Sequence, residues 1–123
     1  MNMWLLFAGV WASLLALVHV FMGGPEIAKP LLQSRDVPST AKYVNYYCWH
    51  LVSFNLAMMA GLLITAGLGV HTLVLGLVAT LQAGFYFVWG IALPLLKQQT
   101  YRDMPQGWLF LPLVVLGAIG AAA

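Results

Sequence analysis

The chain has 123 residues, enough for a single domain, and its composition excludes a soluble one. Hydrophobic residues make up 63% of the sequence and charged residues only 7%, against roughly 25% charged in ordinary globular proteins. Five basic and three acidic side chains are too few to cover a water-exposed surface. A net charge of +2 also provides no basic stripe for nucleic acid. These values predict an integral membrane protein whose main partner is the lipid bilayer.

Four apolar segments are long enough to cross a hydrocarbon core about 30 Å thick, which takes about 20 helical residues. The predicted spans, which together form one domain covering residues 1–123, are residues 3–22, 46–68, 71–93 and 106–123. The first is expected to end at Gly23-Gly24-Pro25 and the third at Pro94, because these residues interrupt helices. The second helix has an earlier starting point at Pro38-Ser39-Thr40, which is a plausible cap. Residues 25–34 are expected to form at most a separate short helix at the membrane interface.

All eight charged side chains lie in two of the three connections between these spans. They are Glu26, Lys29, Arg35, Asp36 and Lys42 in the first connection, and Lys97, Arg102 and Asp103 in the third. Because an even number of crossings separates the two connections, both lie on one side of the membrane. The positive-inside rule assigns that side to the cytoplasm and both termini to the outside. The predicted fold class is therefore all-α, an antiparallel four-helix membrane bundle with N-out and C-out topology.

Small residues recur every four positions in three of the spans, and such strips let membrane helices approach closely. The strips are Ala8, Ala12 and Ala16; Ser53, Ala57 and Gly61; and Thr72, Gly76, Thr80 and Gly84. We expect each strip to face a neighbouring helix, so bulky residues at Ala12, Ala57 or Gly76 should disrupt packing. Extended toward the cytoplasm, the first two strips reach His19 and His50. Both imidazoles are therefore predicted to face the bundle interior.

Polar side chains are concentrated at the cytoplasmic ends of the predicted spans. His19 and His50 lie at about the same depth, roughly 5 Å from the ends of their spans at 1.5 Å per residue. Glu26 follows the Gly-Gly-Pro sequence and is able to fold back beneath them. Imidazole suits transition metals, and two histidines on separate helices are able to hold a haem iron. His19, His50 and Glu26 are therefore the candidate ligands of a transition metal or haem.

A second group of polar and aromatic residues surrounds this position and extends toward the middle of the membrane. The candidate ligand-binding residues are Ser53, Asn55, Gln82, Tyr86, Trp89 and Trp108. A pocket of this composition suits a quinone or another flat lipophilic ligand. No local His-x-x-x-His or Cys-x-x-Cys pair requires a metal, and belts of Trp and Tyr occur at membrane surfaces without any ligand. Three interpretations stay open: a ligand or metal site, an interfacial aromatic belt, and proton or ion transport.

Two families of membrane proteins share features with this chain. Small multidrug resistance transporters also fold four helices from a little over a hundred residues, but they rely on a glutamate in the first span, which here has no acidic residue. The run His19-Val-Phe-Met-Gly-Gly-Pro-Glu26, followed by Trp49-His50, instead resembles a group of uncharacterised bacterial four-span membrane proteins of about this size. That resemblance covers most of the chain. It implies a bacterial inner-membrane location and no particular mechanism.

The sequence leaves two functional classes. In the first, the chain binds a metal, haem or quinone-like molecule at the cytoplasmic end, and substituting either histidine abolishes binding. In the second, it is an accessory or assembly subunit of a larger membrane complex, or part of a homo-oligomer, with no chemistry of its own. No nucleophile with a nearby base, phosphate loop or paired carboxylates is readable in the sequence. We therefore assign no catalytic residue and leave enzymatic activity undecided.

Overall fold

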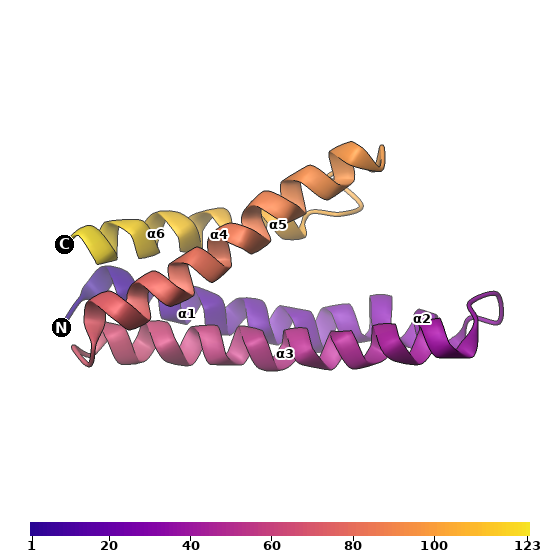
Figure 1. Ribbon diagram of the computed structural model, residues 1–123, viewed down its shortest axis with the longest axis horizontal. Helices are drawn as coiled ribbons and strands as arrows, with labels where there is room; N and C mark the ends of the chain where they lie inside the picture. The colour runs from indigo at the N-terminus through magenta and orange to yellow at the C-terminus, as the bar shows by residue number, and fades with distance from the viewer.

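The computed structural model describes residues 1–123, and it is helical throughout, with no strand (Figure 1). Its helices are α1 (Met3–Val18), the π-helix η1 (His19–Ala28), α2 (Lys29–Gln33), α3 (Ser39–Gly67), α4 (Thr72–Leu96), α5 (Gln106–Leu109) and α6 (Leu111–Ala122). Three continuous helices are long and apolar enough to cross a membrane, namely Met3–Gln33, Ser39–Gly67 and Thr72–Leu96. The fourth apolar helix, Gln106–Ala122, is shorter and is interrupted at Phe110. The all-helical architecture is thus confirmed.

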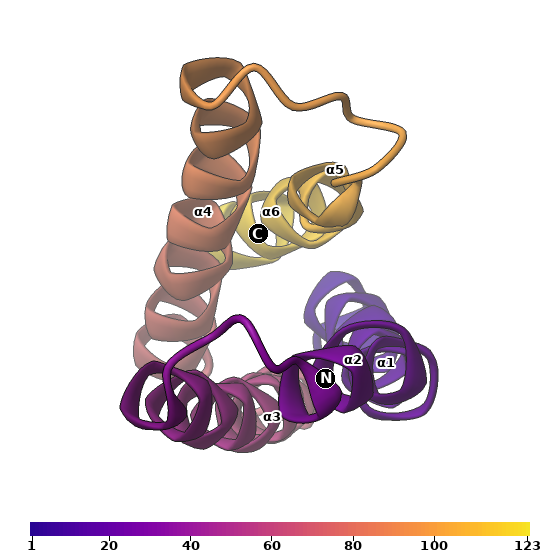
Figure 2. The same cartoon turned by 90° about the vertical axis from the view of Figure 1, so that its right-hand side faces the viewer.

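The helices form an antiparallel bundle in which both chain termini lie at the same end (Figure 1). α1 packs against α3 and α6, and α4 also packs against α3 and α6. The two charged connections, residues 34–38 and 97–105, both lie at the opposite end. Seen from that end, α4 and α5 stand apart from α1, α2 and α3 (Figure 2). The bundle is therefore closed at the end with the termini and open at the end with the charges.

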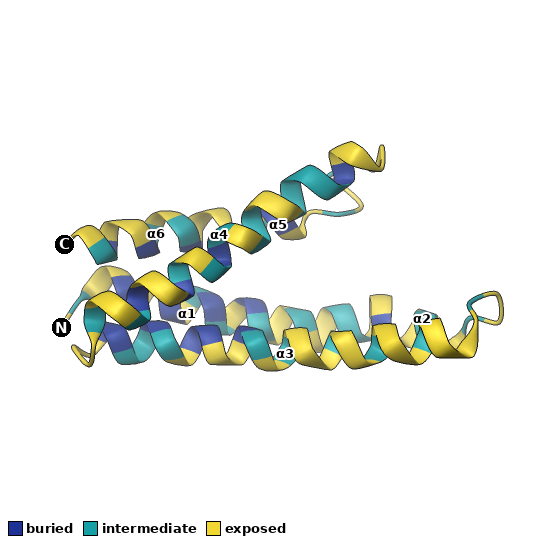
Figure 3. Cartoon of the chain, viewed as in Figure 1, coloured by how far each residue is buried: buried dark blue, intermediate teal, exposed yellow.

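The buried core occupies the closed half of the bundle (Figure 3). Its eleven residues form one cluster: Leu5, Ala8, Ala12, Leu15, Met59, Ala60, Leu63, Ala66, Ala79, Ala83 and Leu113. The predicted packing strip on the first helix is confirmed, because Ala8 and Ala12 are fully buried. On α3 the prediction is wrong, because Ala57 and Gly61 are exposed. α3 instead buries larger residues such as Leu63, and the small side chains of α1 leave room for them.

Close backbone approaches hold the closed end together. A Cβ atom added to Gly9 would lie 2.9 Å from the backbone nitrogen of Ile64, and one added to Gly67 would lie 2.8 Å from that of Leu6. Asn2 joins the same region, since its side-chain amide donates to the Gly120 carbonyl at 2.7 Å. Its backbone N–H donates to the Gly67 carbonyl, also at 2.7 Å. The start of α1 is thus tied to the ends of both α3 and α6.

Two predicted helix ends are wrong, and a proline lies at each. The first helix continues through Gly23-Gly24-Pro25 as the π-helix η1 and then directly into α2, so residues 25–34 form no separate helix. In an α-helix, a proline ring collides with the carbonyl four residues earlier. The wider π-helical turn bonds across five residues, which moves that carbonyl away from Pro25. α4 likewise contains Pro94 and ends at Leu96, where the proline costs only one hydrogen bond near the helix terminus.

Candidate functional site

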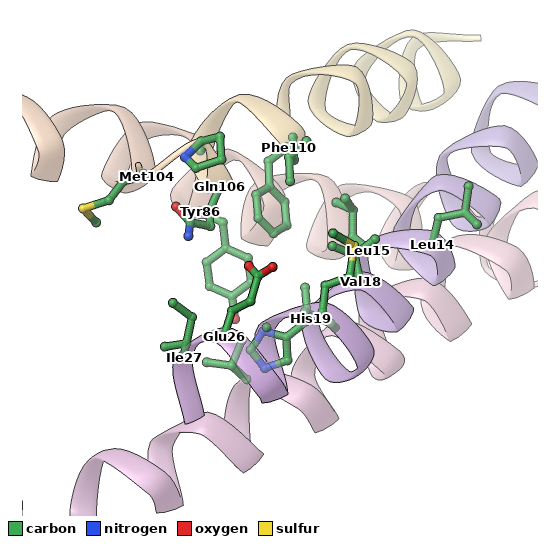
Figure 4. A pocket seen from close by; sticks show the side chains of 18 of the residues that line it. Leu14, Leu15, Val18, His19, Glu26, Ile27, Tyr86, Met104, Gln106 and Phe110 are labelled. Carbon is green, nitrogen blue, oxygen red and sulfur yellow. The ribbon is translucent and has the colours of Figure 1, made fainter. Parts of the chain in front are cut away.

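One cleft lies between the two walls of the open end (Figure 4). One wall consists of α1, η1 and α3, and the other of α4, α5 and the connection between them. The cleft has a volume of about 1170 Å³, whereas pockets for small ligands usually measure about 300–1,000 Å³. It is therefore large enough for a molecule with several rings or with a ring and a chain.

Five aromatic side chains line the cleft. They come from both walls and are Trp11, Trp49, Tyr86, Trp89 and Phe110. Tyr86 and Phe110 contact one another edge to face, with ring centroids 5.1 Å apart. The remaining surface is largely aliphatic, including Leu14, Leu15 and Val18. Such a surface favours a planar apolar ligand over a strongly hydrated one.

His19, the first residue of η1, lies in the wall formed by η1 and α3. Its ring stacks on Trp49, with centroids 3.9 Å apart and planes inclined by 19°. Its Nε2 atom lies 3.4 Å from the Trp49 carbonyl oxygen. Gly23, one turn later, leaves space for this arrangement, because a Cβ atom there would lie 2.6 Å from the Trp49 ring. The imidazole is thus held between two helices with one edge toward the cleft.

Glu26 is the acidic group that η1 contributes to the cleft. It lies two turns along η1 from His19, and its carboxylate extends into the cleft (Figure 4). Arg102 and Asp103 line the cleft from the connection between α4 and α5, and all three charged residues are exposed. Charged groups therefore reach the cleft from both walls, among side chains that are otherwise mostly apolar and aromatic.

Three of the predicted ligand-binding residues meet in a hydrogen-bonded chain between α3 and α4. The side-chain amide of Gln82 donates to the side-chain oxygen of Asn55. The Asn55 amide nitrogen donates to the Tyr86 hydroxyl at 2.7 Å. Only Tyr86 reaches the cleft, and Asn55 and Gln82 lie behind it. Trp89, also predicted, lines the cleft one turn of α4 further along.

The structure places three other predicted residues outside the cleft. His50 is exposed and contacts Tyr46 of its own helix edge-on, with centroids 4.6 Å apart. Ser53 donates to the Trp49 carbonyl at 3.0 Å, and Trp108 packs against Phe87 and Tyr101. One residue turns an α-helix by about 100°, so when Trp49 faces inward, His50 cannot. The prediction that both histidines face the interior is therefore wrong for His50.

The predicted metal ligands are accordingly not brought together. His19 and Glu26 share the cleft, whereas His50 lies outside it. No group of three or more His, Cys, Asp or Glu side chains is close enough to hold a metal ion.

Sequence reasoning missed three aromatic residues of the cleft, Trp11, Trp49 and Phe110. The Trp11 indole N–H donates to the Leu109 carbonyl at 2.8 Å, which joins α1 to α5 next to Phe110. A sequence signal for Trp11 exists, because it precedes His19 by eight residues and therefore shares its helix face. Phe110 carries no such signal, since it lies at an interruption between α5 and α6.

Fold and site together define a small helical bundle with three helices capable of crossing a membrane and one aromatic cleft at its open end. Comparison with known protein families, with curated proteins and with solved structures finds no match for this chain. The resemblance to bacterial four-span proteins stays a prediction.

Proposed function

We propose that this chain is an integral membrane protein that binds a flat lipophilic molecule of the quinone type in its cleft. The observation that carries the proposal is the combination of aromatic and polar groups on one surface. Trp49 and Phe110 line the cleft from opposite walls, and His19 and Tyr86 offer polar atoms beside them. A quinone needs this combination, because its ring is planar and apolar while its carbonyl oxygens accept hydrogen bonds.

The proposed placement is a bacterial inner membrane with four crossings, both termini outside and the cleft at the cytoplasmic side. The three long apolar helices support it, as does the position of every Lys and Arg in or near the two connections of the open end, within residues 29–42 and 97–102. Gln106–Ala122 would supply the fourth crossing, with a length of about 25 Å at 1.5 Å per residue. A lipophilic ligand would then reach the cleft sideways from the bilayer, between the two walls.

Reporter fusions test this orientation. Alkaline phosphatase, which is active only outside the cytoplasm, is expected to be active when fused after Ala123 and inactive when fused after Arg35. The reverse pattern would contradict the N-out and C-out arrangement. Equal activity at both sites, present or absent, would contradict the odd number of crossings that this topology places between Arg35 and Ala123.

The geometry favours a flat organic ligand over haem or a metal. A haem with two axial histidines needs both imidazoles to face one iron, but His50 points away from the cleft that contains His19. A metal site needs several donors around one point, and Glu26 is the only other predicted metal ligand in the cleft. A flat organic ligand needs neither two facing histidines nor several metal donors, so the lining of the cleft suits it better.

A binding titration with menadione, a naphthoquinone without an isoprenoid chain, tests the proposal. Quenching of tryptophan fluorescence is expected to saturate for the wild-type protein in nanodiscs. His19→Ala is expected to weaken binding about fivefold, because the loss of an aromatic contact costs about 1 kcal/mol. His50→Ala is the matched control and is expected to bind as the wild type does. Unsaturable quenching of the wild type would contradict a binding site.

Elemental analysis and visible absorption of the same samples address the alternative ligands. Stoichiometric metal or a haem absorption band in the wild type, lost in His19→Ala, would replace the quinone proposal with a metal or haem site. Wild-type protein that contains neither and still binds menadione would support the proposal.

A second candidate function is that of an accessory or assembly subunit. It is favoured by the exposed strip of small residues on α3, in which nothing lies within 4 Å of a Cβ added to Gly61 and Ala57 is exposed. In a membrane, an outward strip of this kind lets another helix approach. If the chain belongs to a complex or a homo-oligomer through this face, Ala57→Leu is expected to shift its migration in native gels of solubilised membranes. Unchanged migration would contradict this role for the strip.

A further inference from the structure

The hydrogen-bonded chain of Gln82, Asn55 and Tyr86 has a direction. Gln82 donates through its amide nitrogen to the Asn55 side-chain oxygen, so that the Asn55 nitrogen is the atom that faces Tyr86. That nitrogen then donates to the Tyr86 oxygen at 2.7 Å. The chain runs from the helix interface behind the cleft to a residue on the surface of the cleft.

The last member of this chain retains an unused donor. Tyr86 accepts the hydrogen bond from Asn55 through its oxygen, and no hydrogen bond of the protein uses its O–H as a donor. A hydroxyl that accepts one hydrogen bond is polarised and becomes a better donor for the next. Tyr86 is therefore prepared to donate to an acceptor outside the protein.

Packing holds the Tyr86 ring in place. Its hydroxyl is attached to Asn55 at one end, and the face-to-edge contact with Phe110 restrains the ring itself. The surrounding cleft is mostly apolar (Figure 4). In such surroundings, a polar atom of the ligand that lacks a hydrogen-bond partner loses much more binding free energy than it would in water. The site should therefore distinguish a ring that carries an acceptor from the same ring without one.

We infer that Tyr86 is the residue that donates a hydrogen bond to a carbonyl oxygen of the ligand, and that Asn55 and Gln82 are positioning residues for it. The inference rests on the proposed function and narrows its ligand class. The ligand is a planar lipophilic ring with a neutral carbonyl acceptor, and a ring that is purely hydrocarbon binds without the contribution of Tyr86.

Two probes that share a ring system test the role of Tyr86. Menadione carries two carbonyl oxygens, and 2-methylnaphthalene has the same fused rings and methyl group without them. Menadione affinity is measured by tryptophan quenching in nanodiscs, and 2-methylnaphthalene affinity by competition against menadione. Tyr86→Phe is expected to weaken menadione binding about tenfold and to change 2-methylnaphthalene binding less than about twofold. Tyr47→Phe, which removes a hydroxyl from an exposed tyrosine outside the cleft, is expected to change neither.

Asn55→Ala provides a second test that leaves the Tyr86 hydroxyl in place. Without Asn55, the hydroxyl is free to rotate, and menadione binding is expected to weaken about threefold while 2-methylnaphthalene binding is unchanged. This variant also decides the question if Tyr86→Phe folds poorly.

The outcomes separate this inference from the proposed function. Equal losses of both probes in Tyr86→Phe would show that the residue only shapes the cleft and would overturn the inference. Unchanged menadione binding would overturn it as well, with the quinone-binding function intact. If the wild type showed no saturable menadione binding, the proposed function itself would fail, and this inference with it.

Discussion

The two ends of this bundle are built from the same helices but from side chains of different size. At the closed end, Gly9 and Gly67 let the backbones of α1 and α3 nearly touch. At the open end, the same pair of helices is lined by Trp11 and Trp49, and α4 diverges from it. Small residues allow the close packing on which helix association in a membrane depends, whereas at the open end Trp49 stacks on His19 within one wall and Trp11 reaches the Leu109 carbonyl of the other. The packing thus changes from small to aromatic residues along one helix pair, and the cleft lies beside the aromatic part.

Close contact between glycines also holds the outer wall of the cleft together. Gly90 of α4 and Gly107 of α5 meet backbone to backbone, next to the carbonyl that Pro94 cannot hydrogen-bond. The Tyr101 hydroxyl donates to the Ile91 carbonyl at 3.0 Å and attaches the connection to α4. α5 and its connection are therefore attached to α4, while Leu109 at the end of α5 is also hydrogen-bonded to Trp11 of α1. The outer wall of the cleft thus forms one continuous unit.

The largest effect is expected from an added side chain in the closed end. Ala12 is 0% exposed, so Ala12→Leu forces apart helices that have no free space and is expected to cost about 1–3 kcal/mol of unfolding free energy. Ala57→Leu is the matched control, because Ala57 is exposed, and is expected to change stability by less than about 0.5 kcal/mol. Reversible unfolding in mixed micelles measures both. Equal losses would mean that the buried face of α3 has been assigned wrongly.

A smaller effect, on binding, is expected at the open end. In Gly23→Leu the new side chain occupies the position of the Trp49 ring and is expected to displace it from His19, weakening menadione binding about fivefold. Gly24→Leu is the control, because nothing lies within 4 Å of a Cβ there, and both changes raise helix propensity equally. Menadione titration together with tryptophan emission distinguishes them. Binding that weakens equally in both variants would argue against the His19–Trp49 pair as part of the site.

The sequence allowed part of the site to be predicted, and the limits have physical reasons. His19 and Glu26 were predicted because polar residues near the ends of apolar segments are few, and both lie in the cleft. His50 was assigned to the interior from its spacing to Ser53, but Trp49 takes the inward position. Adjacent residues on a helix differ by about 100° in direction, and spacing alone could not decide which of the two faces the neighbouring helix.

By itself, the sequence determined that the fold is helical and that the charged side chains lie at one end of it. A chain with 63% hydrophobic and 7% charged residues favours long apolar helices, which satisfy their own backbone hydrogen bonds. Its charged side chains, all within residues 26–42 and 97–103, lie at the same end of the bundle. Only the tertiary structure decided that the helix passes through Pro25 as a π-helix, that α4 leans away from α1, and that Tyr86 is the polar end of a hydrogen-bonded chain. These features depend on contacts between residues far apart in the chain, such as Asn55 with Tyr86, which no local pattern records.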